Sequence, residues 1–134
     1  MTDMATRPCW QWSGEVTGWL ASPVTSSRCT SPGCGGGCTS VLYVATNKPV
    51  QLRFRTLRLY AGEYVELHDG ATASDRLIGR FTSSHRPSRV IHIAGNEIFV
   101  AFRSRVVLRV NVAFNFTFQP KGMSDVIVFV PDDL

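Results

Sequence analysis

The sequence predicts an all-β domain in which short antiparallel strands form a sandwich or barrel. Apolar residues recur at every second position in several short segments, which is the period of a strand with one buried face. Turn-forming residues separate these segments at short intervals. No segment combines helical periodicity with helix caps. The 134 residues, 44% of them hydrophobic, are enough for one domain with a two-layer core.

The elements follow in order along the chain. Residues 1–12 are expected to be a tail, flexible over 1–8, and residues 22–38, rich in Ser, Pro, Gly and Cys, a loop. Strands are then predicted at 41–45, 50–55, 64–68, 77–78, 90–93, 97–102 and 108–118, with turns at Asn47-Lys48-Pro49, Asp69-Gly70 and Gly95-Asn96. Pro120 ends the last of these strands, and residues 126–130 are expected to add an edge strand. The predicted core consists of Leu52, Phe54, Val65, Leu67, Phe102, Phe114 and Phe116.

Several short motifs in the chain match those of one family. They are Gly18-Trp19-Leu20-Ala21-Ser22-Pro23, Val50-x-Leu52-x-Phe54, Glu63-Tyr64-Val65-Glu66-Leu67-His68-Asp69-Gly70, Leu77-Ile78-Gly79-Arg80-Phe81, Ile98-Phe99-Val100-Ala101-Phe102-Arg103-Ser104 and Ala113-Phe114-x-Phe116. Residues 9–119 thereby resemble the CUB domain family, and residues 120–134 form a C-terminal extension. The resemblance implies a CUB-like jelly-roll β-sandwich of two antiparallel sheets. It also implies a module of secreted and cell-surface proteins that binds proteins and sometimes glycans.

The resemblance also brings a metal site into question. Many members of the family hold Ca²⁺ between three acidic residues, and here only Glu63 matches one of them. The turn of residues 59–62 has no carboxylate, and Arg105 stands at the third position. Because Ca²⁺ needs several oxygen ligands and a guanidinium would repel it, we expect no metal. Glu63 is then either a solvated turn acid or the ion-pair partner of Arg105.

Four cysteines, Cys9, Cys29, Cys34 and Cys38, lie in the first third of the chain. The resemblance pairs Cys9 with Cys38, which leaves Cys29 and Cys34 to close a small loop. The sequence alone allows three pairings. A zinc site of four cysteines and a set of free thiols are the alternatives, although the spacing lacks the paired Cys-x₂-Cys units of zinc ribbons. The family's second disulfide is absent, since Thr82 stands at one of its positions.

No motif predicts catalysis or a cofactor. The chain has no Gly-x-Ser-x-Gly elbow, Walker loop or dinucleotide fingerprint. The three histidines show no metal-ligand spacing and are interpreted as surface or packing residues: they are His68, His85 and His92. Glu66, Asp69 and Asp75 could pair as acid and base, but Asp69-Gly70 is already explained as a turn. We therefore expect a protein that is not an enzyme.

Arginine dominates the charged residues: the net charge is +4, and twelve of the fourteen basic residues are Arg. Arg53 and Arg55 share the polar face of one predicted strand, while Arg103 and Arg105 share that of another stretch. If the two are neighbours, these residues form a basic stripe that would bind an acidic protein partner or a sulfated glycan. Otherwise they form a solvated sheet face. No aromatic residue interleaves them, which argues against nucleic acid.

Two further features bear on location. Asn115-Phe116-Thr117 is a sequon for N-glycosylation, with Asn115 on the polar face of its predicted strand. The chain has no run of about eighteen apolar residues, so we expect no direct membrane insertion. Met1 to Pro8 lack the apolar core of a signal peptide. The chain is therefore either a fragment of a longer extracellular protein or, if complete as given, intracellular.

The leading hypothesis is a non-catalytic protein–protein interaction module, part of a larger extracellular or membrane-bound protein, without the family calcium site. A second hypothesis is a jelly-roll domain that binds carbohydrate or sulfated glycan through the arginines or through Trp10, Trp12 and Trp19. A third is a structural subunit of an intracellular assembly.

Overall fold

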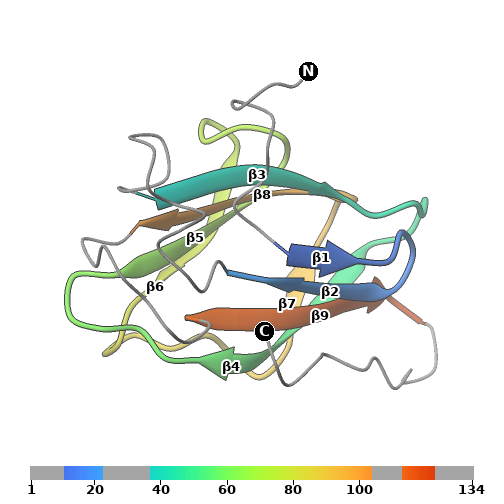
Figure 1. The fold of residues 1–134 in the computed structure, drawn as a ribbon. Helices are drawn as coiled ribbons and strands as arrows, with labels where there is room; N and C mark the ends of the chain where they lie inside the picture. Colours follow the sequence, from blue (N-terminus) through green and yellow to red (C-terminus); the bar gives the residue numbers. More distant parts are fainter. Residues whose placement is uncertain (1–10, 23–36, 104–112, 123–134) are drawn as a thin grey trace.

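The computed structural model describes residues 11–22, 37–103 and 113–122, and the regular elements in these ranges are all β-strands (Figure 1). Their bounds are β1 Gln11–Ser13, β2 Gly18–Ala21, β3 Gly37–Tyr43, β4 Val50–Leu57, β5 Tyr64–Asp69, β6 Arg76–Phe81, β7 Ile91–Ile93, β8 Glu97–Arg103 and β9 Phe114–Pro120. The all-β class predicted from the alternating pattern is confirmed. In these ranges no helix has the length and apolar character needed to cross a membrane.

The strands form two antiparallel sheets, as predicted. Sheet A has five strands in the order β1-β2-β9-β4-β7, and sheet B has four in the order β3-β8-β5-β6. Figure 1 shows the two sheets as separate layers, with β3 and β8 in one and β2 and β9 in the other. In sheet A the strand β9, last in the sequence, lies between β2 and β4. The hydrogen bonds that β9 makes in sheet A therefore join distant parts of the chain.

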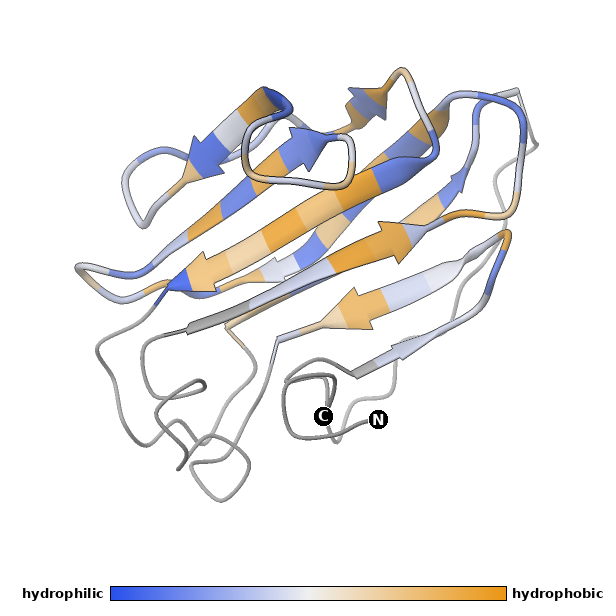
Figure 2. Cartoon of the chain, turned by 90° about the horizontal axis from the view of Figure 1, so that it is seen from above, coloured by the Kyte–Doolittle hydropathy of each residue, from blue (hydrophilic) through white to orange (hydrophobic). Residues whose placement is uncertain are grey.

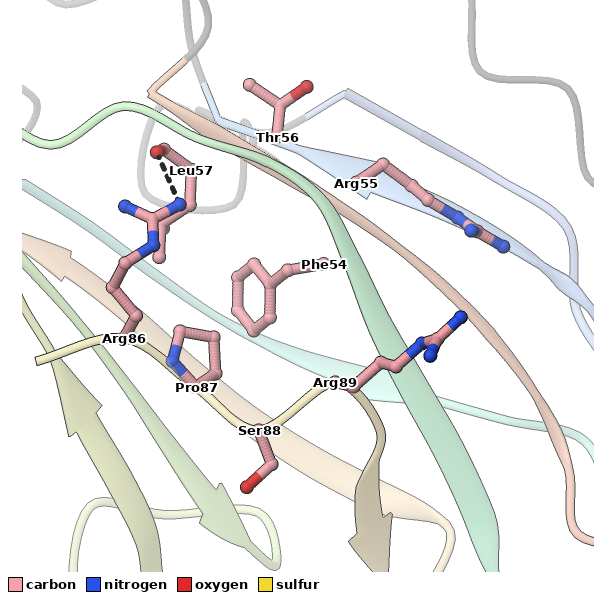
Figure 3. A pocket seen from close by; sticks show the side chains of 8 residues that line it. All are labelled: Phe54, Arg55, Thr56, Leu57, Arg86, Pro87, Ser88 and Arg89. Atoms are coloured by element: carbon pink, nitrogen blue, oxygen red, sulfur yellow. Dashed lines mark hydrogen bonds between the residues drawn. The ribbon is translucent and has the colours of Figure 1, made fainter.

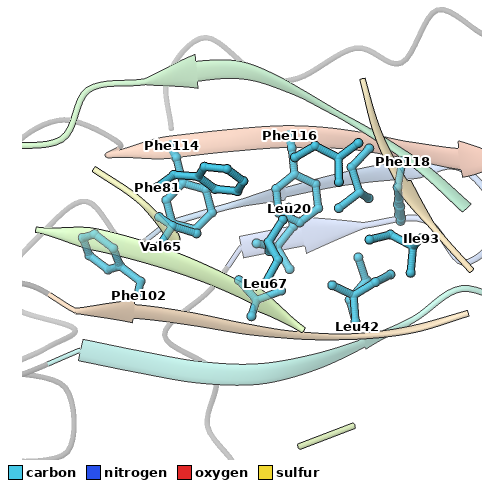
Figure 4. Close-up of a cluster of buried hydrophobic side chains, with 14 of the residues drawn as sticks. Leu20, Leu42, Val65, Leu67, Phe81, Ile93, Phe102, Phe114, Phe116 and Phe118 are labelled. Atoms are coloured by element: carbon cyan, nitrogen blue, oxygen red, sulfur yellow. The ribbon is translucent and has the colours of Figure 1, made fainter. Parts of the chain in front are cut away.

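The hydrophobic core fills the space between the sheets (Figure 4). On β9 the inward positions are Phe114, Phe116 and Phe118, each almost fully buried. Hydrophobic and hydrophilic bands alternate along several strands (Figure 2), as the two-residue period of a strand requires. Of the predicted core, Phe54 is only half-buried, and the rest are buried: Leu52, Val65, Leu67, Phe102, Phe114 and Phe116.

The exposure of Phe54 follows from an irregularity in β4. Phe54 pairs with Phe116 and Thr56 with Asn115, so Arg55 is an extra residue opposite β9. A bulge of this kind bends the strand and turns the neighbouring side chains. The ring of Phe54 still packs against the core, with its centroid 5.4 Å from that of Phe116 and 5.9 Å from that of Phe81. One part of the ring is left at the surface.

The tail predicted for residues 1–12 was wrong at its end, because Gln11 begins the edge strand β1. The pairing of Trp12 with Leu20 in β2 holds this strand in place. Three residues are too few to carry a readable alternation, so only the pairing with β2 defines the strand. Strand β3 also begins earlier than predicted, since Gly37 pairs with Arg103.

Of the two strands expected near the end of the chain, the structure describes part of one. The predicted strand at 108–118 is observed as β9, which continues to Pro120. Pro120 has no N–H to donate, so it is compatible with the end of a strand and not with its middle. Residues 108–112 and the expected edge strand at 126–130 lie outside the described residues.

Candidate functional site

Glu63, the one residue that matches the family's calcium ligands, completes a tight turn before β5. The N–H of Glu63 donates to the carbonyl of Tyr60 at 3.0 Å, and Gly62 supplies the positive φ of 89° that such a turn requires. The carboxylate folds back on the same turn, where Oε1 accepts the N–H of Tyr60 at 2.7 Å. Glu63 is 1% exposed, so its interpretation as a solvated acid was wrong.

Most of the other residues considered for a metal site or a disulfide lie outside the described residues. Arg105, Cys9, Cys29 and Cys34 fall in undescribed segments. Cys38 lies on β3 opposite Phe102. The described ranges contain no group of three or more His, Cys, Asp or Glu residues that could hold a metal ion. The cysteine pairing and the Glu63–Arg105 pair stay predictions.

The four arginines of the expected stripe do not share one sheet. Arg53 and Arg55 lie on β4 in sheet A, and Arg103 lies on β8 in sheet B. Arg105 lies outside the described residues. A shared stripe required β4 and β8 to be neighbouring strands, and they are not, because they belong to different sheets. The two-residue period puts residues of one strand on a common face but does not say which strands are adjacent.

The tryptophans do not form the expected cluster either. Trp12 pairs with Leu20 and Ser13 pairs with Trp19. Paired residues point to the same side of a sheet and successive residues to opposite sides. Trp12 and Trp19 therefore point to opposite faces of sheet A and cannot form one stacking platform for a sugar. Trp10 is not among the described residues.

The structure instead gathers a different set of arginines around a surface pocket (Figure 3). Its volume is about 170 Å³. The lining comes from the end of β4 and from the loop between β6 and β7: Phe54, Arg55, Thr56, Leu57, Arg86, Pro87, Ser88 and Arg89. In Figure 3 the rings of Phe54 and Pro87 lie between Arg86 on one side and Arg55 and Arg89 on the other.

Two of the three guanidinium groups are held by hydrogen bonds. Nη2 of Arg86 donates to the carbonyl of Leu57 at 3.2 Å, which ties the 86–89 loop to β4. Nε of Arg55 donates to Oγ1 of Thr117 on β9 at 3.2 Å. A guanidinium has five N–H donors, so each of these bonds uses only one of them. The bonds therefore position the groups and leave donors available for a ligand.

Among residues 11–22, 37–103 and 113–122, no acidic side chain lines the pocket. Where carboxylates pair with arginines among the described residues, they do so on sheet B: Arg80 with Glu66 at 2.7 Å, and Arg76 with Asp69 at 3.4 Å. The pocket is thus a cationic site with an apolar floor. Such a site can bind an anionic group on a ligand.

Sequence reasoning found Arg55 but missed Arg86 and Arg89. The run Arg86-Pro87-Ser88-Arg89 lies between the predicted strands at 77–78 and 90–93 and was given no binding role. Its two arginines flank a proline, whose fixed φ makes such a loop stiffer, and this was the available signal. The meeting of this loop with Arg55, about thirty residues earlier in the chain, depends on how the sheets pack.

Two of the carboxylates considered for acid–base chemistry, Asp69 and Asp75, accept hydrogen bonds from backbone N–H groups of loops. Oδ2 of Asp75 accepts the N–H groups of Ala71 and Thr72, each at 2.9 Å, and these bonds lower the pKa of Asp75. Asp69 accepts the N–H groups of Ala94 and Gly95. Asp75 thus fixes the loop between β5 and β6, and Asp69 fixes the loop between β7 and β8.

His85, His92 and the sequon residue Asn115 lie in different parts of the fold. His85 stacks on Phe81 with ring centroids 6.0 Å apart, and His92 is exposed on β7. Asn115 lies on β9 between β2 and β4 and is 8% exposed. Among the described residues its Oδ1 has no hydrogen-bond partner. This burial leaves little room for a glycan on the folded domain.

Comparison with known proteins gives one match. A family model, described as the CUB domain, matches residues 35–118, which is more than half of the chain and spans β3 to most of β9. No curated protein matches the chain.

Proposed function

The chain belongs to the CUB domain family, whose members are generally binding modules, and on that premise we propose that it is a non-catalytic protein–protein interaction module. Its partner is an acidic segment of another protein, bound at the pocket of Arg55, Arg86 and Arg89. The observation that carries the proposal is that three arginines line one pocket, whose described lining residues include no carboxylate.

Electrostatics explains why an acidic ligand suits this pocket. Like charges gathered at one place repel one another, and a bound anion removes that repulsion. A pair of unit charges 4 Å apart near a protein surface gains about 4 kcal/mol before desolvation and entropy are subtracted. Screening by salt acts over about 8 Å at physiological ionic strength. The affinity at this site should therefore fall as the salt concentration rises.

Binding at this pocket does not need calcium. Of the three family positions for Ca²⁺ ligands, only Glu63 carries a carboxylate, and Oε1 of Glu63 already accepts a hydrogen bond from Tyr60. The pocket residues are arginines, which bind anions directly. The proposal is therefore a CUB domain that has lost the calcium site and recognises its partner through guanidinium groups.

CUB domains are typically extracellular, and we extend that setting to this chain as part of a longer extracellular or membrane-bound protein. A disulfide between Cys9 and Cys38 belongs to the same proposal. Thiol titration of the native protein tests it. Four reactive thiols would contradict the extracellular setting and favour a subunit of an intracellular assembly.

A binding titration tests the acidic partner. A fluorescent oligoglutamate peptide should bind the wild-type chain at low salt and be released at high salt. The variant Arg55→Glu/Arg89→Glu should bind it at least about tenfold more weakly, since two charges at the pocket are reversed. Arg86 is left unchanged because it also holds the 86–89 loop.

A matched control separates the pocket from the overall charge. The variant Lys48→Glu/Arg103→Glu makes the same change in net charge at exposed residues that do not line the pocket. It should bind the peptide almost as well as the wild type. Equal losses in both variants would overturn the pocket as the binding site. Binding of heparin but not of the peptide would overturn the protein partner and favour a sulfated glycan.

A further inference from the structure

The pocket of Arg55, Arg86 and Arg89 has an apolar floor that a simple carboxylate does not need. Phe54 and Pro87 form this floor between the arginines (Figure 3). Phe54 is supported from behind by the core, with its ring centroid 5.9 Å from that of Phe114 and 5.4 Å from that of Phe116. Its position is therefore fixed, and the ring is only half-buried. A ligand that covered it would remove apolar surface from water.

The size of the pocket suits one aromatic ring. Its volume is about 170 Å³, and a protein cavity of about 150 Å³ is known to accept benzene. Aromatic rings pair well with Phe54 in tilted or edge-to-face arrangements. The carboxylate of Asp or Glu would occupy a small part of this space and leave the ring of Phe54 in contact with water.

The arginines at the rim suit an anion with several acceptor oxygens. Arg86 is held through Nη2 by Leu57, and Arg55 through Nε by Thr117. Figure 3 shows Arg55 and Arg89 on the same side of the ring of Phe54, with Arg86 on the other, so the donors that one oxyanion can share are those of Arg55 and Arg89. A guanidinium binds phosphate-like oxyanions through paired hydrogen bonds. A sulfate or phosphate offers three oxygens for such bonds, where a carboxylate offers two.

Taken together, the volume of the pocket, the half-buried ring of Phe54 and the arginine rim point to one class of side chain. We propose that the pocket binds a tyrosine esterified with a tetrahedral oxyanion, that is, sulfotyrosine or phosphotyrosine, within an acidic segment of the partner. This inference rests on the proposed function and names the group that the pocket selects. The ring covers Phe54 and Pro87, and the oxyanion lies between Arg55 and Arg89. A plain tyrosine lacks the charge, and a plain glutamate lacks the ring.

A set of matched peptides tests the proposal on the whole chain. One acidic peptide is made with sulfotyrosine, phosphotyrosine, tyrosine or glutamate at its central position. We expect the sulfotyrosine or the phosphotyrosine peptide to bind at least about tenfold more tightly than the other two. Because phosphate carries about −1.5 to −2 charges and sulfate carries one, tighter binding of the sulfotyrosine peptide runs against the order of charge and identifies sulfate as the group that the pocket selects.

Variants of the pocket show whether the ring and the charge both matter. Phe54→Leu keeps an apolar side chain but removes the aromatic face, and Arg89→Gln removes one charge. Each should reduce the preference for the ester over glutamate severalfold, whereas Arg103→Gln on β8 should not. Chemical shifts of Phe54 and of the 86–89 loop should change when the ester peptide binds.

The outcomes separate this inference from the proposed function. If all four peptides bind equally at the pocket, the preference for an aromatic oxyanion is overturned and the acidic partner stands. If no acidic peptide binds at all, the proposed function fails as well. Ester binding that is unchanged in Phe54→Leu and Arg89→Gln would place the ligand elsewhere and would overturn the inference.

Discussion

Nε2 of His68 lies 3.1 Å from Oε1 of Glu66 on the outer face of sheet B. The other ring nitrogen, Nδ1, lies 3.0 Å from the carbonyl oxygen of Asp75. Both neighbours are hydrogen-bond acceptors, and only the protonated ring can donate to both of them at once. Glu66 also accepts from Nε of Arg80 at 2.7 Å. His68 is 5% exposed, and its two acceptors favour the protonated form of the ring against the cost of burial.

The first prediction concerns pH. Burial lowers the pKa of His68, but the Asp75 carbonyl and the Glu66 carboxylate raise it, and the net direction is upward from 6.5. The hydrogen bond from His68 is the main cause that lowers the pKa of Glu66 from 4.5, with Arg80 adding to it against burial. The pair therefore stabilises the fold most between about pH 4.5 and 6.5.

The stability from His68 should be lost as pH rises through its raised pKa, and that from Glu66 as pH falls through its lowered pKa. Melting temperatures of the wild type and of His68→Gln, measured from pH 4 to 9, test this. The advantage of the wild type should be largest near pH 6 and shrink above pH 7. An advantage that grew with increasing pH would show that His68 is neutral.

The second prediction concerns the core. Phe114→Ala should lower the free energy of unfolding by about 3–5 kcal/mol, since it leaves a cavity among aromatic rings. The ring of Phe114 lies 5.7 Å from that of Phe102, across the sandwich, and 5.9 Å from that of Phe54. Urea denaturation measures the change. Leu77→Ala is the control, because Leu77 is 51% exposed, and its effect should stay within about 0.5 kcal/mol.

The third prediction concerns calcium. A site with a dissociation constant of 10 μM would stabilise the protein by about 2.7 kcal/mol in 1 mM Ca²⁺. We expect no such effect, because Glu63 alone matches the family ligands. The melting temperature should be the same in 1 mM Ca²⁺ and in EDTA. A clear rise with Ca²⁺, absent in Glu63→Gln, would contradict the loss of the site.

The fourth prediction concerns the turn that Glu63 completes. Glu63→Gln keeps the size of the side chain but replaces a charged acceptor of the Tyr60 N–H with a neutral one. Hydrogen bonds to charged groups contribute about 1.5–3 kcal/mol, and neutral ones about 1 kcal/mol. The variant should therefore unfold at lower urea concentrations. Unchanged stability would mean that the bond to Tyr60 contributes nothing.

The fifth prediction concerns the rate of binding at the pocket. Charge reversal at Arg55 and Arg89 should slow the association of an acidic peptide more than it speeds dissociation, because exposed charges act mainly on the encounter. Stopped-flow measurements at low and high salt give both rates. The difference between wild type and variant should shrink at high salt. Association rates that are equal at low salt would contradict steering by these arginines.

Much of the fold could be predicted from local patterns. Alternation in segments such as Val50–Phe54 identified the strands, and the turn at Asp69-Gly70 was predicted correctly. Burial of Leu52, Val65 and Phe116 follows from the same alternation, because apolar side chains at every second position must face one side. These features depend on residues close together in the chain, so they can be predicted without knowing which strands pair with one another.

The binding site depended on contacts that no local pattern contains. The sequence put Arg53 and Arg103 on polar faces, but only strand pairing separates them, with β4 in sheet A and β8 in sheet B. The bulge at Arg55 exists only against β9, and the loop of Arg86 and Arg89 meets β4 only when the sandwich closes. Strand order and loop packing are set by long-range hydrogen bonds and shared burial. The sequence by itself therefore determined the kind of fold and the abundance of arginine, and the tertiary structure decided which arginines lie around one pocket.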